Sequence, residues 1–138
     1  MSSRLNPYLG FRDNAREAMD FYQGVFGGEI TRTTYGEFNA SEDPSEQDKI
    51  MHSELTTTNG FSLMASDTPN GMELPTSSSI TVSLSGDDEA ELTGYWDKLL
   101  DGGTAIMPLS KAPWGDSFGM LTDKFGTSWM VNIAGASA

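Results

Sequence analysis

Two polar residues lie two positions apart in a segment that is typical of a β-strand. His52 is the only histidine of the chain, and Glu54 follows it after one serine. Residues i and i+2 of a strand point to the same face, so an imidazole and a carboxylate would lie side by side. This spacing predicts that His52 and Glu54 are catalytic residues of acid–base chemistry. The alternative is a hydrogen-bonded strand residue without a catalytic task.

A second set of side chains suits ligand binding. Trp114 and Asp116 flank a glycine just before a predicted strand, where an indole could stack on a ring and a carboxylate could accept a hydrogen bond. The alternative is a tight turn with Trp114 lying over the core. Further ligand contacts are expected from apolar and aromatic strand positions, namely Tyr8, Met64, Phe118 and Met130. Such a lining favours an apolar or aromatic small molecule.

Composition excludes several other classes of function. The chain has no cysteine, which excludes a thiol nucleophile, a disulfide and a thiolate metal site. Gly27-Gly28 follows a predicted helix, whereas a phosphate-binding loop precedes one. The net charge of −12 argues against nucleic acid and against an anionic membrane surface as partners, and it suits a cationic ligand. Without an apolar run near the roughly 18 residues of a spanning helix, a cytoplasmic location is expected.

A repeated unit must position these residues. Residues 14–30 predict a helix with Asn14 as its N-cap and Glu17 in a capping box, then a Gly-Gly stop and a strand. Residues 87–106 repeat the plan, with Asp87 or Asp88 as the cap. Two copies of one supersecondary unit predict two similar half-folds. We therefore expect a single domain over residues 1–138, built of repeats at about 4–67 and 78–134.

The strands of both halves follow from alternation and turn signals. The first helix is expected to place Ala18, Phe21, Tyr22, Val25 and Phe26 on one face. Asp67 is expected to cap a strand end, and Asp123 and Gly126 to shape a hairpin turn. Residues 36–49 are polar and acidic and predict a loop. The predicted strands cover Leu5–Phe11, Glu29–Tyr35, Ile50–Thr57, Phe61–Ser66, Ser78–Ser85, Thr104–Met107, Ser117–Thr122 and Ser128–Ile133.

Three stretches, taken together, resemble the PhnB-like branch of the vicinal oxygen chelate superfamily, also called the glyoxalase/bleomycin-resistance/dioxygenase fold. They cover nearly the whole chain. This resemblance implies an α+β fold in which two βαβββ repeats form curved mixed β-sheets around a cleft, and it implies a homodimer. The stretches are Pro7–Phe11 with Asn14–Ala18, Phe21-Tyr22 and Val25–Glu29; His52–Leu55 with Leu63–Asp67; and Trp114–Gly119 with Asp123–Trp129.

Glyoxalase-type members of this superfamily bind a divalent metal through four strand positions. The resemblance places Asn6 and Ser79 on the two opening strands, and Met64 and Met130 on the two closing strands. A hard divalent ion prefers carboxylate and imidazole ligands, which all four positions lack. The sequence therefore predicts no metal and no cofactor at this site.

The leading hypothesis is a metal-free protein that binds an apolar, aromatic or cationic small molecule between the two sheets. One alternative is a metal-dependent lyase, isomerase or dioxygenase of the glyoxalase type, and another is a drug-sequestering protein of the bleomycin-resistance type. A methyltransferase name is common in this branch, but the chain has no Gly-rich strand–turn–helix to hold a methyl donor. Whether residues 36–49 close over the cleft is left open.

Overall fold

Two sets of elements follow the order β-α-β-β-β in a computed structural model of the chain, which describes residues 5–37, 42–69, 72 and 79–135. A short 3-10 helix, η1, interrupts the first set. The first set comprises β1 (Tyr8–Phe11), α1 (Ala15–Phe26), β2 (Glu29–Thr34), η1 (Pro44–Glu46), β3 (Ile50–Thr56) and β4 (Ser62–Asp67). The second set comprises β5 (Val82–Gly86), α2 (Glu89–Leu100), β6 (Thr104–Lys111), β7 (Ser117–Thr122) and β8 (Ser128–Ile133).

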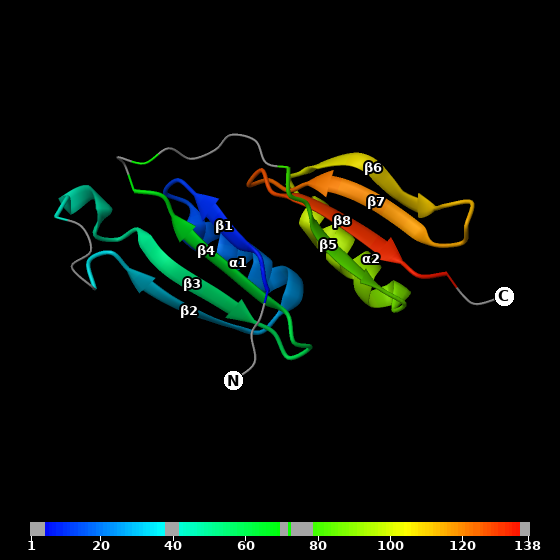
Figure 1. Ribbon diagram of the computed structural model, residues 1–138, viewed down its shortest axis with the longest axis horizontal. Helices are drawn as coiled ribbons and strands as arrows, with labels where there is room; N and C mark the ends of the chain where they lie inside the picture. The colour runs from blue at the N-terminus through cyan, green and yellow to red at the C-terminus, as the bar shows by residue number, and fades with distance from the viewer. Residues whose placement is uncertain (1–4, 38–41, 70–71, 73–78, 136–138) are drawn as a thin grey trace. The chain divides into compact units, whose positions relative to one another are not determined.

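Each set forms its own four-stranded mixed sheet (Figure 1). The strand orders are β1-β4-β3-β2 and β5-β8-β7-β6. In each sheet the first and last strands of the repeat pair in parallel, and the other pairs are antiparallel. The chain divides into unit 1 (Met1–Thr76) and unit 2 (Ser77–Ala138), and each unit is described by itself. The predicted α+β fold with two βαβββ repeats is confirmed.

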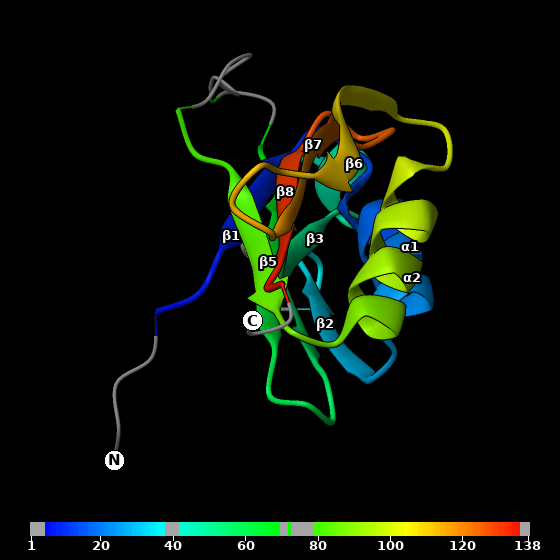
Figure 2. The same ribbon diagram turned by 90° about the vertical axis from the view of Figure 1, so that its right-hand side faces the viewer.

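One helix covers one face of each sheet (Figure 2). Of the residues predicted on one face of α1, Phe21 and Phe26 lie at its edge, where they are half-buried against neighbouring rings. Among the described residues, neither helix has the length and apolar character needed to cross a membrane. The buried side chains are Ala15, Ala18, Met19, Tyr22 and Val25 of α1, and Leu92, Trp96 and Leu99 of α2.

The start of α1 differs from the prediction. Asn14 occupies the N-cap position, but its side chain makes no capping hydrogen bond. Instead the Ala15 N–H donates to Asp67 Oδ1 at 2.9 Å. The second oxygen of the same carboxylate accepts from the Ile50 N–H, also at 2.9 Å. Asp67 is only 3% exposed, so one buried carboxylate at the end of β4 fixes both the first turn of α1 and the start of β3.

Local turn and cap chemistry in unit 2 agrees with the prediction. Of the two candidate caps, Asp88 begins α2, and its Oδ1 accepts from the Glu91 N–H at 3.0 Å. Asp123 shapes the β7–β8 turn, where its carboxylate accepts from the N–H groups of Phe125 and Thr127 and from the Trp129 indole. Gly126 has a positive φ of 90°, which explains its place in this turn.

Several predicted strand boundaries move because pairing decides them. The strand predicted from Leu5 begins at Tyr8, opposite Met64 on β4. The strand predicted to end at Met107 continues to Lys111, because β7 supplies a partner along that length. The strand predicted from Ser78 starts at Val82, and Ser78 itself lies outside the described residues. The predicted loop at 36–49 includes η1.

We predict that Asp67→Ala lowers the free energy of unfolding by about 2–4 kcal/mol, because two buried N–H groups lose their acceptor. Urea denaturation at neutral pH measures the loss. Asp97→Ala, at an exposed position of α2, is the matched control and should change stability by less than about 0.5 kcal/mol. Equal midpoints for Asp67→Ala and the wild type would contradict this role of Asp67.

Candidate functional site

The sheet of unit 1 has one face without a helix, which we call the helix-free face. Along β3, Ser53 and Leu55 are buried on the α1 side, so His52 and Glu54 point to the opposite side. The register continues this face onto the neighbouring strands: Met64 lies opposite Glu54 on one side and opposite Tyr8 on the other. The helix-free face therefore brings four predicted site residues together, namely Tyr8, His52, Glu54 and Met64.

The Tyr8 hydroxyl and His52 Nδ1 form a hydrogen bond of 3.1 Å, and the two rings lie 5.7 Å apart. Because Nδ1 is engaged, the tautomer settles the role of Nε2: Nε2 donates if Nδ1 accepts, and it accepts if Nδ1 donates. Among the described residues, no hydrogen bond reaches Nε2. One ring nitrogen thus orients the imidazole, and the other is available to a ligand.

A β-bulge lies directly beside His52. Thr33 of β2 pairs with His52, whereas the next residue, Thr34, pairs with Ile50, so Met51 is the extra residue. The bulge turns Ile50 into the core, where it is 1% exposed and donates its N–H to Asp67. Bulges frequently re-aim side chains beside functional sites. Here the bulge keeps His52 on the helix-free face while Ile50 joins the other side.

Glu54 is held by its neighbour on β4. The Ser62 hydroxyl donates to Glu54 Oε2 at 2.8 Å. This contact fixes the carboxylate on the sheet surface, where it remains half-buried. A positioned carboxylate can accept a hydrogen bond or pair with a cation. Imidazole and carboxylate thus share one face, as the two-residue spacing predicts.

The other predicted site residues belong to unit 2. Met130 and Phe118 lie on the face of the β5-β8-β7-β6 sheet opposite α2, because their neighbours Trp129, Val131 and Gly119 are buried on the other side. Trp114, in the β6–β7 connection, is 71% exposed. The predicted turn is present, with Gly115 at a positive φ of 103°. Trp114 does not lie over the core of unit 2, so that part of the alternative was wrong.

Asp116 has a structural task in unit 2. Its carboxylate accepts from the Gly135 N–H at 2.9 Å and from Asn132 Nδ2 at 3.2 Å. These two hydrogen bonds, the first above all, lower the pKa of Asp116. The carboxylate therefore stays ionised at neutral pH and ties the end of β8 to the β6–β7 connection. Ligand binding by Asp116 remains a prediction.

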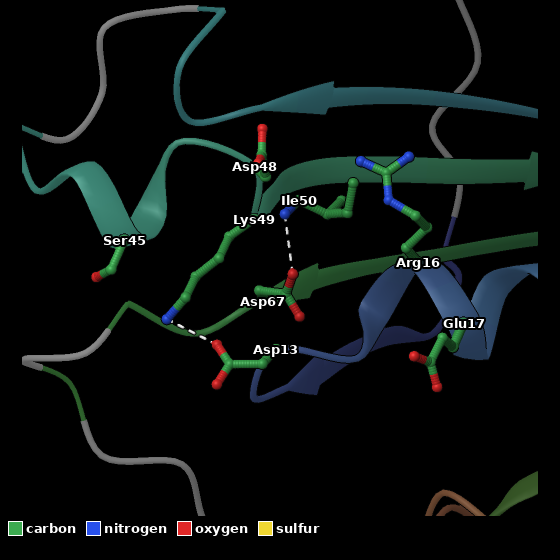
Figure 3. Close-up of a pocket in the computed structure, with 8 residues that line it drawn as sticks. All are labelled: Asp13, Arg16, Glu17, Ser45, Asp48, Lys49, Ile50 and Asp67. Carbon is green, nitrogen blue, oxygen red and sulfur yellow. Dashed lines mark hydrogen bonds and ion pairs between the residues drawn. The ribbon is translucent and has the colours of Figure 1, made fainter.

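A pocket that the sequence did not predict lies in unit 1, between the first turn of α1 and the start of β3 (Figure 3). Its volume is about 370 Å³. Lys49 Nζ and Asp13 Oδ1 approach to 2.7 Å across it, and Arg16 and Glu17 project from α1. The remaining lining residues are Ser45, Asp48, Ile50 and Asp67.

Several polar groups of this pocket have internal partners. The hydrogen bond with Asp13 is the main cause that raises the pKa of Lys49, so the ammonium stays charged. Tyr35 donates to the Asp67 carbonyl oxygen at 2.9 Å, and burial, followed by the charges of Glu46 and Asp67, raises its pKa. The first contact joins the β1–α1 connection to the residue before β3, and the second joins the residue after β2 to the end of β4. The one signal in the sequence was Lys49, a lysine that follows an acidic stretch.

The side chains at the four metal positions expected from the resemblance are poor ligands for a hard divalent ion. Met64 and Met130 occupy equivalent places on β4 and β8, with Tyr8 and Ser83 as their neighbours on β1 and β5. Asn6 and Ser79 were predicted on the two opening strands, which was wrong, because they lie before β1 and β5. Thioether, hydroxyl and amide groups are poor ligands for such an ion. Within the described ranges, no three His, Asp or Glu side chains form a metal-binding group.

Comparisons with known proteins agree with this architecture. The crystal structure of protein PA1353 from Pseudomonas aeruginosa is 38% identical, covers 96% of this chain and 98% of its own, and has a TM-score of 0.80. A PhnB protein from Bacillus cereus is 27% identical over 96% of this chain and 100% of its own, with a TM-score of 0.74.

A glyoxylase/bleomycin resistance protein/dioxygenase domain from Frankia sp. EAN1pec shares the fold, with a TM-score of 0.67, 13% identity and 99% coverage of both chains. The family model described as 3-demethylubiquinone-9 3-methyltransferase matches residues 3–132. The match spans both repeats and confirms the resemblance. The chain belongs to this PhnB-like family, and it shares the fold of the glyoxylase/bleomycin resistance protein/dioxygenase domain.

Proposed function

We propose that this protein binds a cationic small molecule on the helix-free face of unit 1. His52, Glu54 and Tyr8 would supply the polar contacts, and Met64 an adaptable apolar one. The observation that carries the proposal is the hydrogen bond of 3.1 Å between the Tyr8 hydroxyl and His52 Nδ1. It orients the single imidazole of the chain on the helix-free face of unit 1.

Charge supports a cation as the ligand. Glu54 presents a carboxylate that Ser62 already orients, so little further ordering is needed when a ligand binds. The net charge of −12 attracts cations over a longer range and raises their local concentration at the surface. A cationic ligand is also what the drug-sequestering alternative requires.

The proposal uses no resident metal, because the side chains at the superfamily's metal positions are poor ligands for a hard divalent ion. His52 and Glu54 could also move a proton on a bound ligand, which is the metal-free enzymatic alternative. The name of the family model refers to methyl transfer, which would need a site for a methyl donor. The sequence has no Gly-rich strand–turn–helix of the kind that holds one, so the proposal includes no methyl transfer. The homodimer implied by the resemblance stays a prediction.

We predict that phenethylamine binds the wild type and that Glu54→Gln weakens the affinity about tenfold, the effect of losing one charge-assisted contact. Isothermal titration or ligand-observed NMR measures both constants. Glu91→Gln, at an exposed position of α2, removes the same charge elsewhere and should leave the affinity unchanged. Equal losses in the two variants would show a general charge effect and contradict a site at Glu54.

The Tyr8 contact can be tested without a ligand. Because His52 is the only histidine, all imidazole ¹⁵N resonances of the protein belong to it. Tyr8→Phe removes the partner of Nδ1, so we expect the tautomer populations to shift and the ring signals to broaden. Tyr95→Phe, on α2, is the matched control. Unchanged His52 spectra in Tyr8→Phe would refute the orienting hydrogen bond.

Metal dependence separates this proposal from the glyoxalase-type alternative. Protein purified without chelator should contain far less than one equivalent of zinc, manganese, nickel or iron, and adding these ions should leave the melting temperature unchanged. An ion bound at one hundred times its Kd would add about 2.7 kcal/mol, which corresponds to several degrees for a chain of this size. Stoichiometric metal with such a stabilisation would contradict the proposal.

A further inference from the structure

The pocket between the first turn of α1 and the start of β3 has a chemistry of its own (Figure 3). We call it the Lys49–Asp13 pocket, after the ion pair that spans it. Ile50, which lines it, is buried on the α1 side of the sheet, whereas His52 and Glu54 point to the opposite side. The pocket is therefore separate from the helix-free face. Its volume of about 370 Å³ lies in the range of small-molecule sites.

Three of the charged side chains in this pocket are engaged by the protein itself. The two oxygens of the Asp67 carboxylate accept from the N–H groups of Ala15 and Ile50. The Lys49 ammonium pairs with Asp13 at 2.7 Å, and the Lys49 side chain is only 10% exposed. A ligand could use these groups only by breaking an ion pair or a buried hydrogen bond. They form the walls of the pocket, and its contacts with a ligand must come from other side chains.

Arg16 is a cation that the protein leaves open to a ligand. Among the described residues, no hydrogen bond or ion pair engages its guanidinium. The usual partner on a helix would be Asp20, four residues later, but Asp20 pairs with Arg32 of β2 instead. Figure 3 shows the Arg16 side chain extending from α1 beside the start of β3. Its guanidinium is exposed at the pocket, and its fork of N–H donors matches the geometry of a carboxylate.

Two carboxylates of the pocket, those of Asp48 and Glu17, are open in the same way. Both residues are exposed, and within the ranges that the structure describes neither side chain has a hydrogen bond or an ion pair. Asp48 lies two residues before β3, and Figure 3 shows it and Arg16 on either side of Ile50. The pocket thus offers one cationic and two anionic groups, and they come from two different segments of the chain.

Groups of both charges indicate a ligand that carries both charges. An exposed ion pair contributes little by itself, because solvent and salt screen it. A molecule that joins an ammonium to a carboxylate can form two such pairs, and the second one then forms at a high effective concentration. Four carboxylates and two cations line the pocket, so a simple anion would be repelled. A simple cation would leave Arg16 without a partner from the ligand.

We propose that the Lys49–Asp13 pocket is a second binding site and takes a small zwitterion, namely an amino acid whose ammonium and carboxylate are separated by a short chain. Arg16 binds the carboxylate of this ligand, and Asp48 binds its ammonium. The ion pair of Lys49 and Asp13 stays intact and forms a wall of the site. This inference goes beyond the proposed function, because it concerns other residues, the other side of the sheet and a ligand of different charge.

Three probes of equal length separate the two charges. γ-Aminobutyrate carries both, butyrate only the carboxylate, and butylamine only the ammonium. Amide chemical-shift mapping of the ¹⁵N-labelled protein should show saturable changes at Arg16, Glu17 and Asp48 with γ-aminobutyrate, at an affinity at least about fivefold above that of either analogue. ε-Aminocaproate, with caproate and hexylamine, covers a longer spacing. No saturable change with either zwitterion, or an amine that binds as tightly as the zwitterion of its length, would overturn the proposal.

Neutral variants assign the two contacts. Arg16→Gln should weaken the tighter-binding zwitterion about fivefold without weakening the amine of the same length, whereas Asp48→Asn should weaken both. Both side chains are exposed, so the variants should fold. Lys98→Gln and Asp97→Asn, at exposed positions of α2, are the matched controls and should leave all affinities unchanged. Equal effects in variants and controls would show a general charge effect and overturn the site.

This site and the proposed function can fail separately. Glu54→Gln should leave the binding of γ-aminobutyrate unchanged, and Arg16→Gln should not weaken that of phenethylamine. Loss of γ-aminobutyrate binding in Glu54→Gln would place the zwitterion on the helix-free face and contradict its assignment to the Lys49–Asp13 pocket.

Discussion

Within each unit, the one helix covers only one of the two faces of the four-stranded sheet. Strand alternation sends every second side chain to each face, so the covered face takes the core residues and the other face takes what remains. In unit 1 the remainder includes Tyr8, His52, Glu54 and Met64; in unit 2 it is mainly methionine and serine. The position of each helix therefore determines where functional side chains can lie, and both repeats obey the same constraint.

Asp67 links this constraint to the candidate site. Its two carboxylate oxygens accept the N–H groups of Ala15 and Ile50, so a single buried group begins α1 and holds the bulged end of β3. The bulge in turn places Ile50 in the core while His52 stays on the open face. In unit 2 a buried carboxylate stabilises a different place, the β7–β8 turn, where Asp123 accepts hydrogen bonds from the Phe125 N–H and the Trp129 indole. The scaffold repeats, but its buried carboxylates do not.

Most of the architecture was predictable because periodicity and glycine signals are local. Both helices, the strands of both hairpins and the shared face of His52 and Glu54 follow from such patterns. An added Cβ at Gly28 or Gly103 would collide with the carbonyl oxygen of Thr56 or Thr122, which explains why the Gly-Gly stop recurs. The Tyr8–His52 contact, the bulge at Met51 and the capping by Asp67 were not predictable, because each depends on pairing between distant strands.

The face of the unit 2 sheet opposite α2 shows the same limit. The sequence favours Met130 as an apolar contact, but Met107 and Met120 join it on this face only through the register of β6, β7 and β8. The Lys49–Asp13 pocket also escaped prediction, since it forms where α1, β3 and η1 converge. This pocket is the main alternative to the helix-free face as the binding site of a cationic ligand in unit 1, because both contain positioned carboxylates.

The most direct test of the central claim is a backbone amide chemical-shift map of the ¹⁵N-labelled protein during titration with phenethylamine. The account predicts that the largest saturable changes within unit 1 occur at Tyr8, His52, Glu54 and Ser62, which line the helix-free face. Changes centred on Asp13, Arg16 and Lys49 instead, with the β3 and β4 residues of the open face unmoved, would contradict it.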